Sequence, residues 1–349
     1  MKRAGIVIML FWLAACSSDQ VQQDDGSAAS NDESFQTLVT DLKSPWDIEY
    51  DQQTFYISER EGTITSWTEG EESVRYPVQT RKEIVQRGEG GLLGFKLLPG
   101  FKDHQRALAY HTYEEEGSIM NRIIEIERNS DQWKETSVLL ENIPGAQFHN
   151  GGRIEIGPDN QIYVTTGDSL NESLAQDPES LAGKILRLST DGTAAEGNPF
   201  DSSYVYSYGH RNPQGLTWNK DGELYAAEHG PDNHDEVNLI QPGQNYGWPQ
   251  IVGDEEREGM VTPLFETGRN TWAPSGVVFF REELIVASLR GKAVMKLSPS
   301  GGDPETLTEQ YGRIRDVEVV DDRLYFITNN TDGRGSPESE DDQLVKYSP

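Results

Sequence analysis

The feature that most constrains the fold of this chain is a motif that recurs six times along it. Each copy has a short apolar strand, a polar turn, a second strand, a Gly-rich or charged turn and then a third strand. The copies follow one another at a mean step of about 54 residues. They begin near Pro45, Leu92, Gly151, Pro213, Ser275 and Ile314. Repeats of this length, built from antiparallel strands, are typical of β-propeller blades.

The residues inside each copy follow the two-residue period of β-strands. Residues 154–156 (IEI) and 162–164 (IYV) alternate in side-chain direction, and the PDN sequence between them has turn chemistry. No stretch of the sequence has a sustained helical stripe. We therefore predict an all-β fold, a six-bladed β-propeller of four-stranded antiparallel blades that occupies residues 36–349 as one catalytic domain. A β-sandwich or a two-domain β protein is the alternative.

The first 35 residues are predicted to lie outside the propeller. Lys2 and Arg3 precede an apolar run at residues 6–13, which ends in Leu-Ala-Ala-Cys at Cys16. This order is typical of a secretory signal peptide, and its end resembles the lipoprotein box of bacteria. We expect residues 1–15 to be a lipoprotein signal peptide, Cys16 to be lipidated, and residues 16–35 to be a flexible acidic tether. An ordinary signal peptide with a chance cysteine is the alternative.

These features predict a lipid-anchored protein on the periplasmic side of a bacterial envelope. Ser17 rather than aspartate follows the cysteine, which favours the outer membrane. The chain holds 59 acidic and 30 basic side chains, a formal charge of −29. Because such a field repels phosphate backbones, nucleic acid is excluded as a partner.

A propeller gathers loops from all its blades at one end of a channel, so motifs at blade edges can form one site. His149, in the HNGGR motif, precedes the first strand of the third copy. Imidazole is the usual general base near neutral pH, and the neighbouring glycines allow a ligand to approach the backbone. A histidine with a structural role is the alternative.

Several cationic residues lie at other blade edges. Arg211 and Asn212 open the fourth copy in GHRNPQG, Arg313 and Arg315 alternate in RIRD, and Arg290 ends the ASLR strand. Guanidinium groups that face one channel indicate an anionic ligand. Pairing with the chain's many carboxylates is the alternative.

Two further loops have the chemistry of a binding site. Gly230 and Pro231 can present backbone carbonyls, which suit Ca²⁺, and Glu89 lies in the Gly-rich turn GEGGLLG. The sequence holds no phosphate-binding loop, zinc cluster, serine elbow or dinucleotide fingerprint. The residues therefore suit an anionic cofactor held on Ca²⁺, without naming it.

Taken together, EGGLLG, HNGGR, LAGKILRL, YGHRNPQGL, EHGPDNHDEVN, NYGWP, APSG and RIRD resemble the soluble pyrroloquinoline quinone (PQQ)-dependent glucose and aldose sugar dehydrogenases. The match runs in order over about residues 40–349. That family has a six-bladed propeller fold, which agrees with the repeat count.

The resemblance implies oxidation of an aldose sugar at C1 to the lactone, with PQQ and Ca²⁺ as cofactors and a quinone or cytochrome as external electron acceptor. His149 would be the general base, and Arg211 would lie beside the reacting quinone oxygen. Glu89 and Ser169 would face the substrate. The implied PQQ contacts are Arg211, Asn212, Thr271, Arg290, Arg313 and Arg315, with the Gly230 and Pro231 carbonyls on Ca²⁺.

This chain departs from the glucose enzyme at two positions. Phe148 replaces an aspartate before the base, which predicts that an orienting carboxylate is missing, and Glu89 replaces a glutamine. Both departures favour the aldose sugar branch. A second, structural Ca²⁺ is expected near Val252, Asp254 and Glu256.

Two other functions stay open from the sequence. One is a Ca²⁺-dependent propeller lactonase, with Glu89, Asp168 and Asp232 as metal ligands. The other is a non-catalytic propeller that binds glycans or a partner protein.

Overall fold

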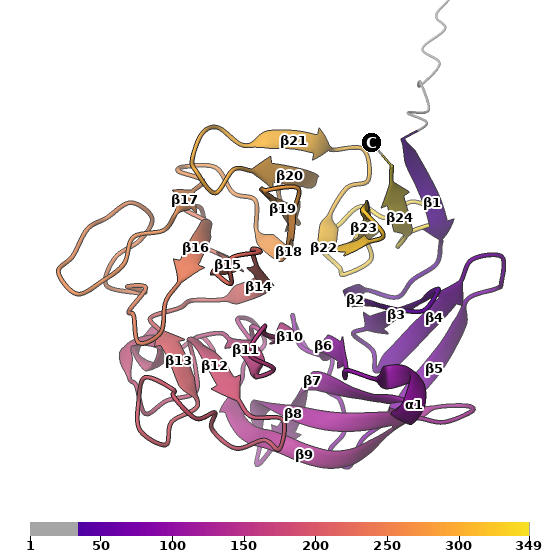
Figure 1. The fold of residues 1–349 in the computed structure, drawn as a ribbon, viewed down its shortest axis with the longest axis horizontal. Coiled ribbons are helices and arrows are strands. Elements are labelled where there is room, and N and C mark those ends of the chain that lie inside the picture. Colours follow the sequence, from indigo (N-terminus) through magenta and orange to yellow (C-terminus); the bar gives the residue numbers. More distant parts are fainter. Residues whose placement is uncertain (1–33, 349) are drawn as a thin grey trace, which may run out of the picture. The chain divides into compact units, whose positions relative to one another are not determined.

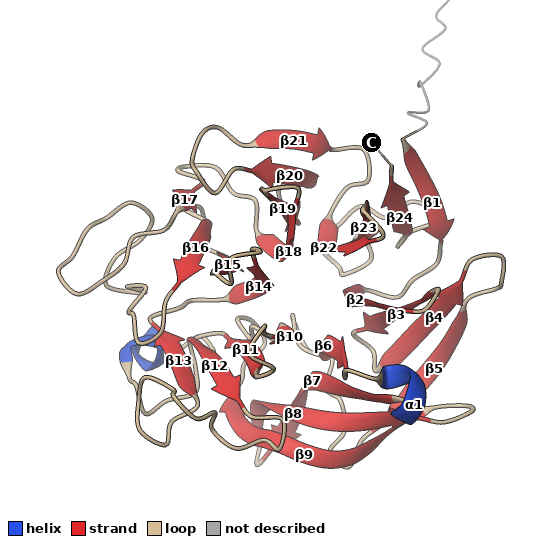
Figure 2. Ribbon diagram, in the orientation of Figure 1, coloured by secondary structure: helices blue, strands red, loops and turns tan. Residues whose placement is uncertain are grey.

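The computed structural model describes residues 34–348, and β-strands dominate them. The strands form four-stranded blades arranged in a ring (Figure 1), and helix is confined in this range to α1 (Phe101–His104) and a 3₁₀ turn at Glu172–Gln176. Figure 2 shows how little of the ring is helical. The predicted all-β, six-bladed propeller is therefore confirmed. The predicted signal peptide, Cys16 and the tether up to residue 33 lie outside the described residues. The predicted boundary between tether and propeller was one residue too late, because Phe35 already belongs to β1 (Phe35–Val39).

The first three blades follow one another along the chain, each from its inner to its outer strand. Blade one is β2 (Pro45–Asp51), β3 (Thr54–Glu59), β4 (Thr63–Thr68) and β5 (Val74–Gln79). Blade two is β6 (Leu92–Leu97), β7 (Arg106–Glu115), β8 (Ser118–Arg128) and β9 (Trp133–Pro144). Blade three is β10 (Ile154–Ile156), β11 (Ile162–Thr166), β12 (Lys184–Leu188) and β13 (Val205–Tyr208).

The last three blades complete the ring. Blade four is β14 (Pro213–Trp218), β15 (Leu224–Glu228), β16 (Glu236–Ile240) and β17 (Phe265–Glu266). Blade five is β18 (Pro274–Phe280), β19 (Glu283–Ser288), β20 (Ala293–Leu297) and β21 (Glu305–Thr308). Blade six is β22 (Ile314–Val320), β23 (Arg323–Thr328), β24 (Leu344–Tyr347) and β1 (Phe35–Val39). The six inner strands begin at or close to the predicted starts of the repeats; β10 begins three residues after Gly151.

Two strand pairings were not predicted from the repeats. The strand β1 pairs antiparallel with β24, so the N-terminal strand of the described chain supplies the outer edge of the last blade. Phe35 packs on Tyr347 there, with ring centroids 4.7 Å apart. In addition, β5 pairs parallel with β9 and joins blades one and two into one eight-stranded sheet. The first pairing closes the ring by joining the two ends of the propeller.

The inner strands approach one another closely around the axis. Gly215 in β14 and Gly276 in β18 lie where a Cβ atom would collide with Ser275 and Asp316 of the next blade. These positions therefore need glycine because a neighbouring backbone or side chain fills the space. The second strands β11 and β15 are buried along their whole length because blades cover both faces.

Arg153 crosses the axis and connects four blades. Its guanidinium bonds Asp47 of blade one at 2.5 Å, Asp316 of blade six at 3.0 Å and the Gln214 carbonyl of blade four at 3.0 Å. It also lies over the Trp46 ring, 4.4 Å from the centroid. Its two aspartates extend the network, since Asp47 accepts the Phe95 N–H and Asp316 accepts the Ile48 N–H.

The channel end opposite the loops described below is lined by carboxylates. Lys96 bonds Glu49 at 2.7 Å and Glu155 at 2.6 Å. Burial raises the pKa of Glu318 to about 8; Lys96 opposes this rise, and Glu49 and Glu155 add to it. This end of the channel therefore holds more carboxylates than cations.

We expect Arg153→Leu to lower the free energy of unfolding by about 3–5 kcal/mol, because it leaves Asp47 and Asp316 buried without their cation. Urea denaturation measures the loss. Arg281→Ala, which removes a solvent-exposed ion pair with Asp322 between blades five and six, is the control and should change little. Equal losses of unfolding free energy in the two variants would show that the axial network stabilises the fold no more than a surface ion pair does.

We expect Glu318→Gln to change the pH dependence of stability. The folded-state pKa of Glu318, about 8, lies above its ordinary value of 4.5, so the native state binds this proton more tightly than the unfolded state. The resulting stabilisation is complete below about pH 4.5 and is lost as the pH rises to about 8. The melting temperature of the variant, relative to that of the unmodified protein, should therefore increase as the pH rises from 5 to 8. A constant difference would contradict this.

Candidate functional site

Two kinds of loop reach the same end of every blade. Because strands within a blade are antiparallel, the loop before the inner strand and the turn between the second and third strands lie at one end. They surround a cavity of ≈ 300 Å³. Loops before inner strands contribute the predicted residues Glu89, His149, Arg211, Asn212, Thr271 and Arg313. Turns between the middle strands contribute Gly230, Pro231 and Arg290.

The other predicted residues lie outside the cavity wall. Arg315 is buried, where it donates to Gln214 at 2.8 Å and to Ser275 at 3.3 Å. Ser169 lies next to His149, since its N–H donates to the His149 carbonyl, while its hydroxyl donates to Pro144. Val252, Asp254 and Glu256 lie in the loop between β16 and β17, away from the cavity.

His149 is held by a carboxylate that follows β11. Its Nδ1 lies 2.8 Å from Oδ1 of Asp168, whose side chain is 1 % exposed. The other Asp168 oxygen accepts the Trp248 indole N–H at 2.8 Å. Nε2 is then the ring nitrogen left to face the cavity. The expectation from Phe148 that an orienting carboxylate is missing was wrong, because Asp168 supplies one from another loop.

Glu89 ties the His149 loop to its neighbours. Its N–H donates to the Gln147 carbonyl at 2.7 Å, and its carboxylate accepts the His149 N–H at 3.3 Å. Gly88 makes this approach possible, since its φ is +60° and a Cβ atom would collide with the Gln147 carbonyl. The base and the predicted substrate carboxylate are therefore fixed to each other.

The arginines of the cavity have different partners. Arg211 donates to the His229 and Pro231 carbonyls and lies 5.4 Å from the centroid of the Trp248 ring. Arg313 pairs with Asp332 at 2.7 Å, so pairing with the chain's own carboxylates, the alternative from the sequence, holds for this residue. Arg211 is satisfied mainly by neutral carbonyls and keeps its positive charge for a ligand.

Buried polar atoms without a hydrogen-bond partner occur at the cavity. They include Asn212 Nδ2 and His229 Nε2; Nε of Arg315, outside the cavity wall, also has no partner. Burial lowers the pKa of His229 to about 4, against the attraction of Asp235 and Glu89. Burial likewise lowers the pKa of Arg315 to about 9. Because buried polar groups are normally paired, the two cavity atoms are available to a polar ligand.

Asp235 joins two of the loops that line the cavity. One carboxylate oxygen accepts the Gly230 N–H at 2.8 Å. The other accepts the Thr271 hydroxyl at 3.0 Å and the N–H groups of Trp272 at 2.6 Å and Ala273 at 2.8 Å. The turn with the predicted calcium ligands is thereby fixed to the loop before β18.

Sequence reasoning missed several cavity residues. Asp168 was considered as a metal ligand and not as the partner of His149, although its position directly after a buried strand was a usable signal. His229 and Asp235 lie on either side of the GPDN segment, where the sequence predicted backbone carbonyls as ligands. Arg334 lies in the polar loop between β23 and β24, and no local pattern distinguishes it.

The side chains alone do not build a metal site. Among residues 34–348, no group of three histidine, cysteine or acidic side chains is arranged to hold a metal ion. A lactonase built on Glu89, Asp168 and Asp232 would need such a group. The second calcium site near Val252 stays a prediction.

The fold and the cavity define a class, a six-bladed β-propeller with a cation-lined polar cavity at one end of its axis. Residues 42–337 match the family described as Glucose / Sorbosone dehydrogenase. The chain belongs to that family.

Individual relatives are similar over most of the propeller. The PQQ-bound aldose sugar dehydrogenase of Streptomyces coelicolor is 37 % identical, with a TM-score of 0.84 over 89 % of this chain and 96 % of that one. The aldose sugar dehydrogenase of Escherichia coli is 28 % identical over 90 % of this chain and 92 % of its own. Quinoprotein glucose dehydrogenase B of Acinetobacter calcoaceticus is 34 % identical over 54 % of this chain, and the match spans 46 % of that protein.

None of the helices in the described part of the chain has the length and apolar character needed to cross a bilayer.

We expect Asp235→Asn to speed hydrogen exchange at the Gly230, Trp272 and Ala273 amides by about tenfold or more, since it replaces charge-assisted hydrogen bonds. Mass spectrometry of deuterium uptake measures this. Asp232→Asn, a cavity carboxylate in the same turn, is the control. Unchanged exchange in the Asp235 variant would contradict the role of this carboxylate in joining the loops.

Proposed function

We propose that this protein is a PQQ-dependent aldose sugar dehydrogenase of the glucose type, which oxidises an aldose at C1 to the lactone. The observation that carries this proposal is the pairing of His149 with buried Asp168 at 2.8 Å in a cavity walled by arginines. The arginines can bind an anionic cofactor, and His149 beside them can remove a proton from a sugar that lies against that cofactor.

The residues present fit PQQ, which carries three carboxylates. Arg211 and Arg290 offer cationic donors, Arg313 offers a guanidinium that is already paired with Asp332, and the unpartnered Asn212 Nδ2 offers a further buried donor. Thr271 and buried Arg315 complete the predicted set. When bound, PQQ supplies the acceptor for the hydride that leaves C1. The Gly230 and Pro231 carbonyls would hold Ca²⁺, which suits a site with too few carboxylates to bind the metal alone.

His149 takes the proton in this mechanism. Nε2 accepts it from the C1 hydroxyl of the sugar as the hydride leaves C1, and the C1–OH group becomes the lactone carbonyl. Asp168 accepts a hydrogen bond from Nδ1–H, so it fixes the ring and stabilises the imidazolium that forms. Glu89 would accept hydrogen bonds from the sugar, with Ser169 supporting the His149 loop.

The proposal extends to partners and location. Electrons would pass to an external quinone or cytochrome. Cys16 would carry the lipid that anchors the protein on the periplasmic side of the envelope. The serine that follows this cysteine favours the outer membrane as the site of the anchor. These statements rest on the sequence and the family.

The lactonase alternative is less well supported. It needs Asp168 as a metal ligand, but both oxygens of that carboxylate are bonded to His149 and Trp248. A non-catalytic propeller gives no reason for the pairing of His149 with buried Asp168 beside the cavity.

The test is to titrate the apoprotein with PQQ in the presence of Ca²⁺ and to record the absorption spectrum before and after glucose is added. We expect stoichiometric binding, followed by bleaching to the reduced quinone. His149→Gln should bind PQQ but lose about 10²–10⁴-fold in turnover, whereas Arg211→Ala should also weaken PQQ binding.

The control is His104→Gln, since His104 lies in α1 at the opposite end of the blades. It should leave both binding and turnover unchanged. Absence of PQQ binding by a folded protein would overturn the proposed function, and full turnover in the His149 variant would overturn the mechanism.

A further inference from the structure

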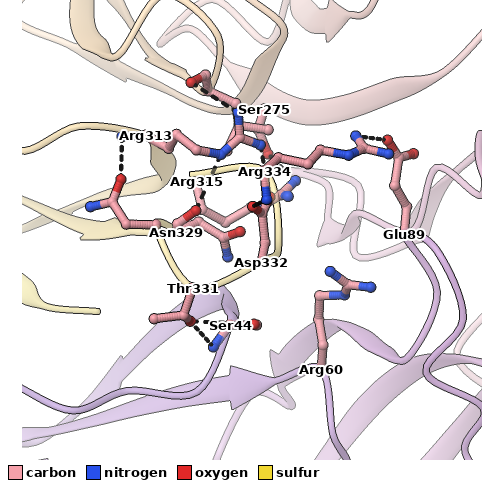
Figure 3. Close-up of polar contacts among 12 residues, drawn as sticks. Ser44, Arg60, Glu89, Ser275, Arg313, Arg315, Asn329, Thr331, Asp332 and Arg334 are labelled. Atoms are coloured by element: carbon pink, nitrogen blue, oxygen red, sulfur yellow. Dashed lines mark hydrogen bonds and ion pairs between the residues drawn. The ribbon is translucent and has the colours of Figure 1, made fainter. Parts of the chain in front are cut away.

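An ion pair crosses the mouth of the cavity between two blades. Nη1 of Arg334, in the loop between β23 and β24, lies 2.5 Å from Oε1 of Glu89, in the loop before β6 (Figure 3). The two residues are 245 positions apart in the chain. The Arg334 guanidinium also lies 5.1 Å from the centroid of the Phe148 ring.

The loop that carries Arg334 is fixed at its base. Asp332 accepts the Arg334 N–H at 2.9 Å through one oxygen and pairs with Arg313 at 2.7 Å through the other. Thr331 bonds Asp342 at 2.5 Å and accepts the Ser44 N–H at 3.1 Å. The Arg334 side chain is 47 % exposed, so a partly exposed side chain extends from a loop whose backbone is fixed.

The loop that carries Glu89 is fixed from the other side. Arg60, in the turn between β3 and β4, donates to the Gly90 carbonyl at 2.9 Å and to the Gly88 carbonyl. The Glu89 N–H bonds Gln147. The backbone of Glu89 is therefore set without Arg334, and the ion pair fixes the direction of its carboxylate.

Each oxygen of the Glu89 carboxylate has one partner, Arg334 for Oε1 and the His149 N–H for Oε2. A carboxylate oxygen can accept more than one hydrogen bond. We propose that Arg334 is a positioning residue that determines sugar affinity: its ion pair holds Glu89 ionised and aimed into the cavity, beside His149, to accept sugar hydroxyls. This inference rests on the proposed function.

The charge around Glu89 supports this role. Burial raises the pKa of Glu89, but His229, Arg334 and the His149 N–H together lower it to about 2. His229 is a cation only below its own pKa of about 4, so Arg334 is the partner that stays charged at neutral pH. The remaining cations that face Glu89 are Arg211, Arg60 and Arg315.

The first measurement uses the apoprotein and needs no activity. We expect ¹³C NMR to find the Glu89 carboxyl titrating near 2 in the unmodified protein, with a higher pKa in Arg334→Ala. The rise should be partial, because His229 is itself a cation below its pKa of about 4 and also lowers the pKa of Glu89 in that range. Arg334→Lys keeps the positive charge and should restore much of the lowering. An unchanged pKa in Arg334→Ala would overturn the proposal, whether or not the protein oxidises sugars.

The second measurement is a double-mutant cycle on the PQQ- and Ca²⁺-loaded enzyme. Arg334→Ala should raise KM for glucose about tenfold, and kcat should change less because His149 keeps its Asp168 contact. In a Glu89→Gln background the same change should alter KM by less than about twofold. Arg281→Ala, at the other end of the blades, is the control and should leave KM unchanged.

Comparing Arg334→Ala in the unmodified protein and in the Glu89→Gln variant shows whether Arg334 acts through Glu89. An equal rise in KM with and without the Glu89 carboxylate would overturn positioning through Glu89. If the unmodified protein binds PQQ but oxidises no sugar, the proposed function fails, and the Glu89 titration still decides whether Arg334 controls this carboxylate.

Discussion

The buried Arg153 network at the axis is the interaction on which the rest of the propeller depends. Blades of a propeller meet at their inner strands, and here one guanidinium bonds blades one, four and six from the edge of blade three. Its aspartate partners then accept main-chain N–H groups of β6 and β2. Because the two aspartates come from blades one and six, which do not adjoin blade three, the network fixes the geometry of the ring and not only of neighbouring pairs.

The same short motif holds the ring and presents the base. In HNGGR, Arg153 reaches the axis while His149, four residues earlier, lines the cavity. The His149 backbone has a φ of 57°, an unusual conformation for a residue other than glycine. It is maintained by Glu89 on its N–H and by Ser169 on its carbonyl. The base and the axial arginine are thus separated by only three residues of backbone, Asn150, Gly151 and Gly152.

The sequence predicted the repeated blades and the features that depend on one short motif. The repeat predicted the blade starts, since each inner strand has the same apolar pattern and a defined turn before it. It did not predict that β1 completes blade six, because Phe35–Val39 lacks the rest of a repeat. The motifs placed His149, Arg211 and Asn212 in one site. They could not pair His149 with Asp168 or Glu89 with Arg334, because such contacts depend on how loops from different blades meet.

The two ends of the channel have opposite charge, and this difference explains how an acidic protein can hold an anion. At the cavity end, Arg211 is satisfied by carbonyls and Arg315 by Gln214 and Ser275, all neutral partners that cancel no positive charge. At the opposite end, Lys96 is bonded by two carboxylates, with Glu318 nearby. Neutral partners therefore leave Arg211 and Arg315 available to a ligand, whereas Arg313 and Arg334 are already paired with Asp332 and Glu89. The net charge of −29 counts every charged side chain of the sequence, whereas the hydrogen-bond partners of Arg211 and Arg315 are neutral groups.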